Sequence, residues 1–146
     1  FRSAKLDPRA VTPTRKHPQD AGCDLYALSD YKAAPGSSVI VRTGITAEIP
    51  EGYCLQFWPK GRHDHVVGAG IVDTGYQGEL LVKVINHTAY PMQIQAGEAV
   101  AQAVLVKIDT PEVEEIPLEE IHKVSTARGA TGGIVEQKQG KRTKAA

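Results

Sequence analysis

The stretch that decides the fold reads Gly68-Ala69-Gly70-Ile71-Val72-Asp73-Thr74-Gly75-Tyr76-Gln77-Gly78-Glu79-Leu80. It places one carboxylate, Asp73, three residues before one aromatic ring, Tyr76, and surrounds them with four glycines. Glycine costs conformational entropy on folding and offers no side chain to pack, so a purely structural pair of strands has no need of so many. Glycines allow a ligand to approach the backbone, and the two side chains at the tip can then act on it. The alternative is an ordinary glycine-rich hairpin with an aspartate on its surface.

The rest of the chain has the pattern of short apolar runs and turns that is typical of an all-β protein. Short runs of branched and aromatic residues are bounded by proline and glycine turns, which is typical of a barrel or a sandwich. The expected strands cover residues 39–43, 45–49, 53–58, 80–86, 92–95 and 100–108. The last is apolar almost throughout, which predicts a strand buried on both faces. One short helix is expected over residues 118–124, with acidic residues in its first turn.

Length and charge narrow the function classes. The 146 residues suit a single globular domain with a hydrophobic core. Basic and acidic residues both number 17, so no overall field favours nucleic acid, and no apolar run is long enough to span a bilayer. Cys23 and Cys54 lie on strand-like segments, which indicates reduced thiols and a cytoplasmic or at least intracellular protein. Because the first residue is Phe1 and not methionine, we expect a processed, trimmed or partial chain.

The sequence changes character at Ser125. It becomes rich in glycine, alanine and threonine and then basic, with Lys138, Lys141, Arg142 and Lys144 and no acidic residue after Glu136. This composition predicts a β domain over residues 1–124 and a mobile arm over residues 125–146. For the section beyond Glu136, the alternative is a disordered tail without a role.

Four further segments carry polar residues at turn or loop positions. They are residues 20–25 with Asp24, 58–62 with Lys60, 97–102 with Gln102, and 128–133 with Arg128. Each has an ordinary explanation when taken alone. Asp24 can be a turn residue, Gln102 can satisfy a backbone group, and a glycine loop with one arginine can be a linker.

In this order the five segments resemble the five motifs of the trimeric dUTP pyrophosphatases (dUTPases), over residues 12–133. The specific parts are Pro13-Thr14, Ala-Gly-x-Asp-Leu at 21–25, and Ala-Gly-Ile-Val-Asp-x-x-Tyr-x-Gly at 69–78. The resemblance implies an all-β, distorted jelly-roll (β-clip) barrel with one short helix and a mobile C-terminal arm. It also implies a homotrimer in which each active site combines the glycine-rich hairpin of one chain, the other segments of its neighbour, and the arm of the third.

The resemblance further implies hydrolysis of dUTP to dUMP and pyrophosphate, which keeps uracil out of DNA and supplies dUMP for thymidylate synthesis. Asp73 would be the general base that deprotonates the attacking water. Tyr76 would lie under the deoxyribose and leave no room for a 2′-hydroxyl. Asp24 would hold water molecules of a Mg²⁺ ion that the triphosphate brings with it.

The remaining roles implied by the resemblance concern the base and the phosphates. Uracil would be read by the backbone around Val67, Gly68 and Gly70, and a mispaired base would leave buried polar groups unmatched. The phosphates would be bound by Lys60, Gln102, Arg128 and Gly129.

Two segments depart from the family pattern. After Pro59 the family has arginine and serine, whereas this chain has Lys60 and Gly61, and the loop looks short enough that residues between these two are expected to be missing. In the fifth motif, Gly132-Gly133 is followed by Ile134, so the family's phenylalanine lid has no counterpart. These departures keep open a non-catalytic binding or regulatory protein on a dUTPase scaffold. A dCTP deaminase is disfavoured because Lys83 stands where that family needs a glutamate.

Two other patterns are weaker. His63 and His65 can form a metal pair, because alternate residues of a strand share a face, but with no further ligand nearby a solvated loop is the better explanation. Gly68 and Gly70 match only part of a dinucleotide-binding fingerprint, since Asp73 replaces its third glycine and a strand follows.

Overall fold

The computed structural model describes residues 1–61 and 65–130, and their regular structure is almost entirely β-strand. These residues fall into two units, of which the first, Phe1–Thr110, contains every strand. The second begins at Pro111, earlier than the boundary expected at residue 124; the functional division at residue 125 stays a prediction. No helix among the described residues is long and apolar enough to cross a membrane.

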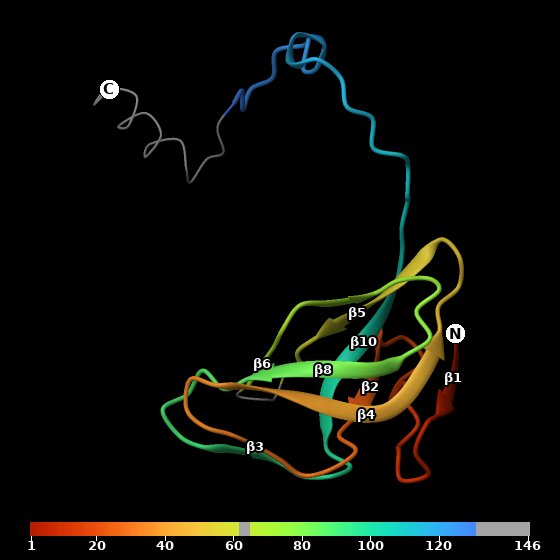
Figure 1. The fold of residues 1–146 in the computed structure, drawn as a ribbon, viewed down its shortest axis with the longest axis vertical. Coiled ribbons are helices and arrows are strands. Elements are labelled where there is room, and N and C mark those ends of the chain that lie inside the picture. Colours follow the sequence, from red (N-terminus) through yellow and green to blue (C-terminus); the bar gives the residue numbers. More distant parts are fainter. Residues whose placement is uncertain (62–64, 131–146) are drawn as a thin grey trace. The chain divides into compact units, whose positions relative to one another are not determined.

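The strands of the first unit form three antiparallel sheets (Figure 1). Sheet A joins, in spatial order, β1 (Arg2–Lys5), β4 (Ser38–Glu48), β8 (Glu79–Ile85) and β6 (Val66–Val67). Sheet B joins β2 (Gly22–Tyr26), β10 (Ala99–Lys107), β5 (Tyr53–Trp58) and β7 (Gly70–Val72). The third sheet pairs β3 (Tyr31–Ala33) with β9 (Met92–Ile94). The all-β prediction is therefore confirmed.

One core cluster draws on both larger sheets. Its fully buried members include Val41, Val82 and Val84 from sheet A and Leu25, Leu55 and Val100 from sheet B. Buried and exposed residues alternate along β8, as expected when a strand covers a core with one face. The prediction that residues 100–108 are buried on both faces is wrong for the single chain, because alternate β10 positions, including Gln102 and Val104, are only half-buried.

The two strands expected at 39–43 and 45–49 are one long strand, β4, with a bulge. Its register against β8 shifts between Arg42 and Thr46, which pair with Leu81 and Glu79. Gly44 sits in this bulge with a φ of +68°, and a Cβ there would lie 2.9 Å from Ala10 Cβ. The left-handed backbone and the close packing both require glycine, and the bulge turns β4 without ending it.

The glycine-rich stretch is not a hairpin, which corrects the prediction. β7 pairs with β5 in sheet B, whereas β8 pairs with β4 and β6 in sheet A. Residues 73–78, which we call the crossing loop, therefore carry the chain from one sheet to the other. Gly75, with a φ of +92°, provides the turn that this crossing needs.

The helix expected over 118–124 is reduced to a single 3₁₀ turn, η1 (Leu118–Glu120). Ile121 is already extended, and no residue of the turn is buried. A short segment without a packed apolar face lacks the tertiary contacts that stabilise most helices, so the acidic first turn alone does not sustain one.

Candidate active site

The crossing loop holds Asp73 and Tyr76 in a tight turn. The backbone N–H of Tyr76 donates to the carbonyl of Asp73 at 3.2 Å. The hydroxyl of Thr74 lies within hydrogen-bond distance of the carbonyls of Pro50 and Tyr53, at 3.1 and 3.0 Å, which ties the loop to the start of β5. These bonds turn a spacing in sequence into a fixed spacing of the carboxylate and the ring.

Asp73 and Tyr76 line one cavity of about 260 Å³, which we call the Asp73 cavity. Its other walls come from β5, β7 and β8 and are largely apolar: Phe57, Gly70, Ile71, Val72, Glu79, Leu80 and Leu81. A largely apolar hollow with a few polar groups, here Asp73 and Glu79, is the usual form of a small-molecule site. Within the described residues, the Asp73 carboxylate has no hydrogen-bond or ion-pair partner, so it is available to a ligand.

The Tyr76 ring is fixed at its far end. Its hydroxyl donates to the backbone carbonyl of Glu79 at 2.7 Å, so the side chain folds back over the loop from which it comes. Tyr76 is 43% exposed, and it forms a wall of the Asp73 cavity. A wall held at both its backbone and its hydroxyl is suited to excluding a ligand that is slightly too large.

An ion pair that sequence reasoning missed supports this wall. Arg42 of β4 donates from Nη2 to Glu79 Oε1 at 3.0 Å, and the backbone N–H of Gly44 donates to Glu79 Oε2 at 3.1 Å. Burial raises the pKa of Glu79, but the hydrogen bonds from Arg42 and Gly44 outweigh it and hold that pKa below its usual value. The two partners lie 37 residues apart, on strands whose register shifts at the bulge between Arg42 and Thr46, so nothing local in the sequence indicates the contact.

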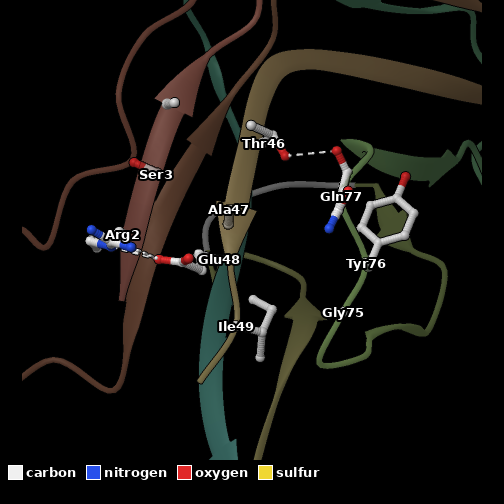
Figure 2. Close-up of a pocket in the computed structure, with 10 residues that line it drawn as sticks. Arg2, Ser3, Thr46, Ala47, Glu48, Ile49, Gly75, Tyr76 and Gln77 are labelled. Carbon is white, nitrogen blue, oxygen red and sulfur yellow. Dashed lines mark hydrogen bonds and ion pairs between the residues drawn. The ribbon is translucent and has the colours of Figure 1, made fainter. Parts of the chain in front are cut away.

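A larger cavity of about 660 Å³, which we call the edge cavity, lies between the crossing loop and the edge formed by β1 and β4 (Figure 2). Figure 2 shows Tyr76 and Gln77 beside Thr46, whose hydroxyl donates to the Gln77 carbonyl at 3.2 Å. Of the predicted site residues, Tyr76 is the only one described on its walls. The edge cavity is therefore a weaker candidate for the chemistry than the smaller Asp73 cavity.

A second group of predicted residues forms a row across sheet B. Gln102 of β10 pairs with Asp24 of β2 on one side and with Trp58 of β5 on the other. Residues paired across neighbouring strands lie on the same face of a sheet, about 5 Å apart. The sheet thus joins three segments that are far apart in the sequence.

Lys60 and Gln102 are both engaged within the chain. The Lys60 ammonium forms a hydrogen-bonded ion pair with Asp24 Oδ1, and the side chains of the two residues are 28% and 17% exposed. Gln102 Nε2 donates to the Pro59 carbonyl at 3.1 Å and so holds the segment that carries Lys60. Gly22 leaves the necessary space, because a Cβ there would lie 2.7 Å from Gln102 Oε1.

Only one of the three residues predicted to read uracil lies on the Asp73 cavity. Gly70 lines it, whereas the backbone N–H of Gly68 already donates to the Lys83 carbonyl at 2.8 Å. Val67 pairs with Val84 in sheet A and lines a neighbouring apolar cavity of about 410 Å³ beside Trp58. The uracil-reading roles of Val67 and Gly68 stay predictions.

Arg128 and Gly129 belong to the unit that begins at Pro111. Gly129 has a φ of +54°, and its N–H donates to the Thr126 carbonyl at 3.3 Å, so Arg128 lies within a turn over residues 126–129. The rest of the glycine-rich loop, with Gly132 and Gly133, and the basic tail lie outside the described residues.

The predicted histidine pair is described only in part, since His63 and Asp64 lie outside the described residues. His65 is buried, and its Nε2 lies 3.0 Å from the carbonyl of Val100, so at this residue the solvated-loop explanation is wrong. A buried ring hydrogen-bonded to the backbone is typical of a structural histidine.

The described residues contain no group of three or more His, Cys, Asp or Glu side chains that could hold a metal ion. Asp24 offers one half-buried carboxylate beside a cation. This set fits only a metal that brings most of its ligands with it, as Mg²⁺ does when it arrives on a polyphosphate with its own waters.

Comparison with known proteins agrees with this geometry. The dUTPase family model matches residues 9–133. The deoxyuridine 5′-triphosphate nucleotidohydrolase of Nocardia farcinica is 34% identical over 97% of this chain and 90% of its own length. That of Arabidopsis thaliana is 33% identical over 90% of this chain and 82% of its own length.

Solved structures share the fold. A mutant of the Staphylococcus bacteriophage 80alpha dUTPase with dUpNHpp gives a TM-score of 0.81 at 23% identity, over 90% of this chain and 94% of the other. A mutant dUTPase of S. aureus phage phi11, which coordinates a structural Mg(II) ion, gives 0.74 at 24% identity, over 79% and 95%. With a family model that covers most of its length and relatives at about a third identity, this chain belongs to the dUTPase family.

Proposed function

We propose that this protein hydrolyses dUTP to dUMP and pyrophosphate. The observation that carries the proposal is the Asp73 cavity, where the crossing loop of a dUTPase-family chain holds, beside an aromatic wall, a carboxylate that no other described residue engages. Both side chains lie on the segment that resembles the family's most specific motif.

Asp73 acts as the general base. Its carboxylate accepts a proton from a water molecule as the water oxygen bonds to the α-phosphorus of dUTP, and the bond from that phosphorus to the β-bridging oxygen breaks. Pyrophosphate leaves with the electron pair, and no covalent intermediate with the enzyme is needed. The exposed position of Asp73 on the crossing loop allows water to reach it.

Tyr76 and the apolar walls select the nucleoside. The ring supports the deoxyribose and denies space to a 2′-hydroxyl, because its hydroxyl is anchored to the Glu79 carbonyl. The backbone near Gly70, with Val67 and Gly68 in the proposed set, reads the polar edge of uracil. The buried apolar walls Phe57, Val72 and Leu80 keep water from the base, so an analogue with mismatched donors would leave buried groups without partners.

The row on sheet B binds the phosphates. Lys60 supplies a positive charge. Gln102 holds the segment that carries Lys60 and lies on the same face of the sheet as Asp24. Asp24 would hold water molecules of a Mg²⁺ ion carried by the triphosphate. When bound, that ion neutralises phosphate charge and orients the leaving group. Arrival of the nucleotide must exchange the Asp24–Lys60 ion pair for these new contacts.

The sheet register supports a site shared between copies of the chain. Asp73 follows Val72 of β7, which pairs with Leu55. Asp24 of β2 lies at the level of Trp58, so along the strands the two positions differ by about four residues. Across the sheet, β2 and β7 are three strand spacings apart. Standard strand dimensions then separate the Asp73 and Asp24 backbones by about 19 Å within one chain. A catalytic base must lie within hydrogen-bond reach of the proton that it accepts, and this separation favours a site in which the two carboxylates come from different copies of the chain. We propose a homotrimer for this reason and from the family resemblance.

The arm completes the proposed site. Arg128 and Gly129 would clamp the terminal phosphates, since arginine forks and backbone amides both suit phosphate oxygens; the Gly129 N–H would exchange its bond to the Thr126 carbonyl for one to the phosphate. A cytoplasmic location, proposed from the cysteines, agrees with the free, buried thiols of Cys23 and Cys54.

The test is pyrophosphate release from dUTP, UTP, dCTP and dTTP with Mg²⁺ and with EDTA. We expect release from dUTP alone, loss of it in EDTA, and a decrease of about 10²- to 10⁴-fold in kcat for Asp73→Asn. Equal rates for Asp73→Asn and the unchanged protein would refute the role of Asp73. No release from any nucleotide would favour a binding protein on a dUTPase scaffold, and ammonia release from dCTP would favour a deaminase.

A further inference from the structure

We infer that Gly78 is a specificity-determining residue, because its missing side chain sets where the Tyr76 ring lies. The inference rests on the proposed function, in which that ring supports the deoxyribose. Gly78 does not line the Asp73 cavity itself, so it acts only through Tyr76. It is a positioning residue and not a catalytic one.

The carrying observation is the space around Gly78. A Cβ added there would lie 2.5 Å from the Tyr76 hydroxyl oxygen, 2.7 Å from Cζ and 3.1 Å from Cε1. All three atoms belong to the outer half of one ring. Real Cβ contacts are not this short, so any residue other than glycine at position 78 must displace the Tyr76 ring from its present place.

The backbone around Gly78 is held firmly, so the ring is the part that moves. Glu79 is anchored through its carboxylate to Arg42 and to the N–H of Gly44. On the other side, Gln77 is tied through its carbonyl to Thr46. Unlike the glycines with positive φ, Gly78 has a backbone that other residues can adopt, so its identity is not required by the turn.

The displaced ring has somewhere to go. Tyr76 lines both the Asp73 cavity and the edge cavity, which makes it a partition between them. A methyl group on Gly78 breaks the bond from the Tyr76 hydroxyl to the Glu79 carbonyl and shifts the partition. The sugar subsite then loses the close wall that excludes a 2′-hydroxyl, while Asp73 keeps its place.

The test compares the Gly78→Ala variant with the unchanged protein, each in the oligomeric state in which it is purified. The readout is the ratio of kcat/KM for dUTP to kcat/KM for UTP, at the same Mg²⁺ concentration. We expect Gly78→Ala to lower this ratio about tenfold or more, the scale of discrimination that one group-sized change in a fitted pocket provides. Tyr76→Phe, which keeps the ring and loses only the anchor at Glu79, should lower it less.

Gly36→Ala is the matched control. Gly36 has a φ of +72° and open space around its Cβ position, so the change strains the backbone far from the crossing loop. Any effect of Gly36→Ala on kcat/KM should be the same for dUTP and for UTP, so the ratio should stay unchanged. A ratio for Gly78→Ala within twofold of the unchanged protein would overturn the inference and leave the proposed function intact. Absence of dUTP hydrolysis in the unchanged protein would overturn both.

Discussion

Replacing Gly44 by alanine tests whether the β4 bulge requires glycine for two reasons, its left-handed backbone and the close packing around it. Gly44 has a φ of +68°, and its Cβ would lie 2.9 Å from Ala10 Cβ and 3.0 Å from Leu28 Cδ1. Left-handed backbone costs an alanine about 1–2 kcal/mol. Forcing an extra methyl into a filled site adds about 1–3 kcal/mol. We therefore expect Gly44→Ala to lower the free energy of unfolding by about 2–5 kcal/mol.

Gly36→Ala separates the two contributions. Gly36 has nearly the same φ, +72°, but nothing within 4 Å of its Cβ position, so it carries the backbone cost alone. The difference between the two variants in urea unfolding, at one protein concentration, measures the packing contribution, about 1–3 kcal/mol. Equal losses in the two variants would refute the argument that Ala10 and Leu28 fill the bulge.

Three other predictions concern the site and the core. Lys60→Gln should raise KM for dUTP about tenfold with a smaller change in kcat, because it removes ground-state phosphate binding; initial rates that show an unchanged KM would contradict it. Glu79 has a lowered pKa in the folded state, so its contribution to stability is present above its unfolded pKa of about 4.3 and is lost as the pH falls through the folded value. When the melting temperature is measured from pH 7 to pH 3, it should therefore fall less steeply for Glu79→Gln than for the unchanged protein. The same fall in melting temperature for both proteins would count against the pairing of Glu79 with Arg42. Leu55→Ala, at a position with no exposed area, should cost about 2–5 kcal/mol in urea unfolding, and a loss below 1 kcal/mol would mean that the core collapses around the gap.

What the sequence predicts well is local. Asp73 and Tyr76 share one loop, so their meeting at a cavity follows from a spacing of three residues, and the all-β class follows from proline, glycine and branched residues. The resemblance to dUTPases assigns Asp24, Lys60 and Gln102 to one phosphate-binding group; the structure brings the three residues together, and their roles stay predictions.

What the sequence leaves out depends on long-range pairing. The crossing loop looks like a hairpin because its flanking runs are both strand-like, but β7 and β8 find partners in different sheets. The Arg42–Glu79 contact requires the β4 bulge, whose extent depends on packing against Ala10 and Leu28. The helix expected after Pro117 fails for the opposite reason, because no apolar contact supports it.

The pairing of β2 with β10 has a consequence for how the protein is made. The strand that carries Asp24 leaves the ribosome early, and β10, an inner strand of sheet B that carries Gln102, leaves last of all the described strands. Until then β2 and β5 have open edges, and contacts between such distant segments form slowly. The phosphate-binding row is thus assembled at the end of folding, so a nascent or truncated chain without β10 would hold Asp73 in its loop yet have no place for a triphosphate.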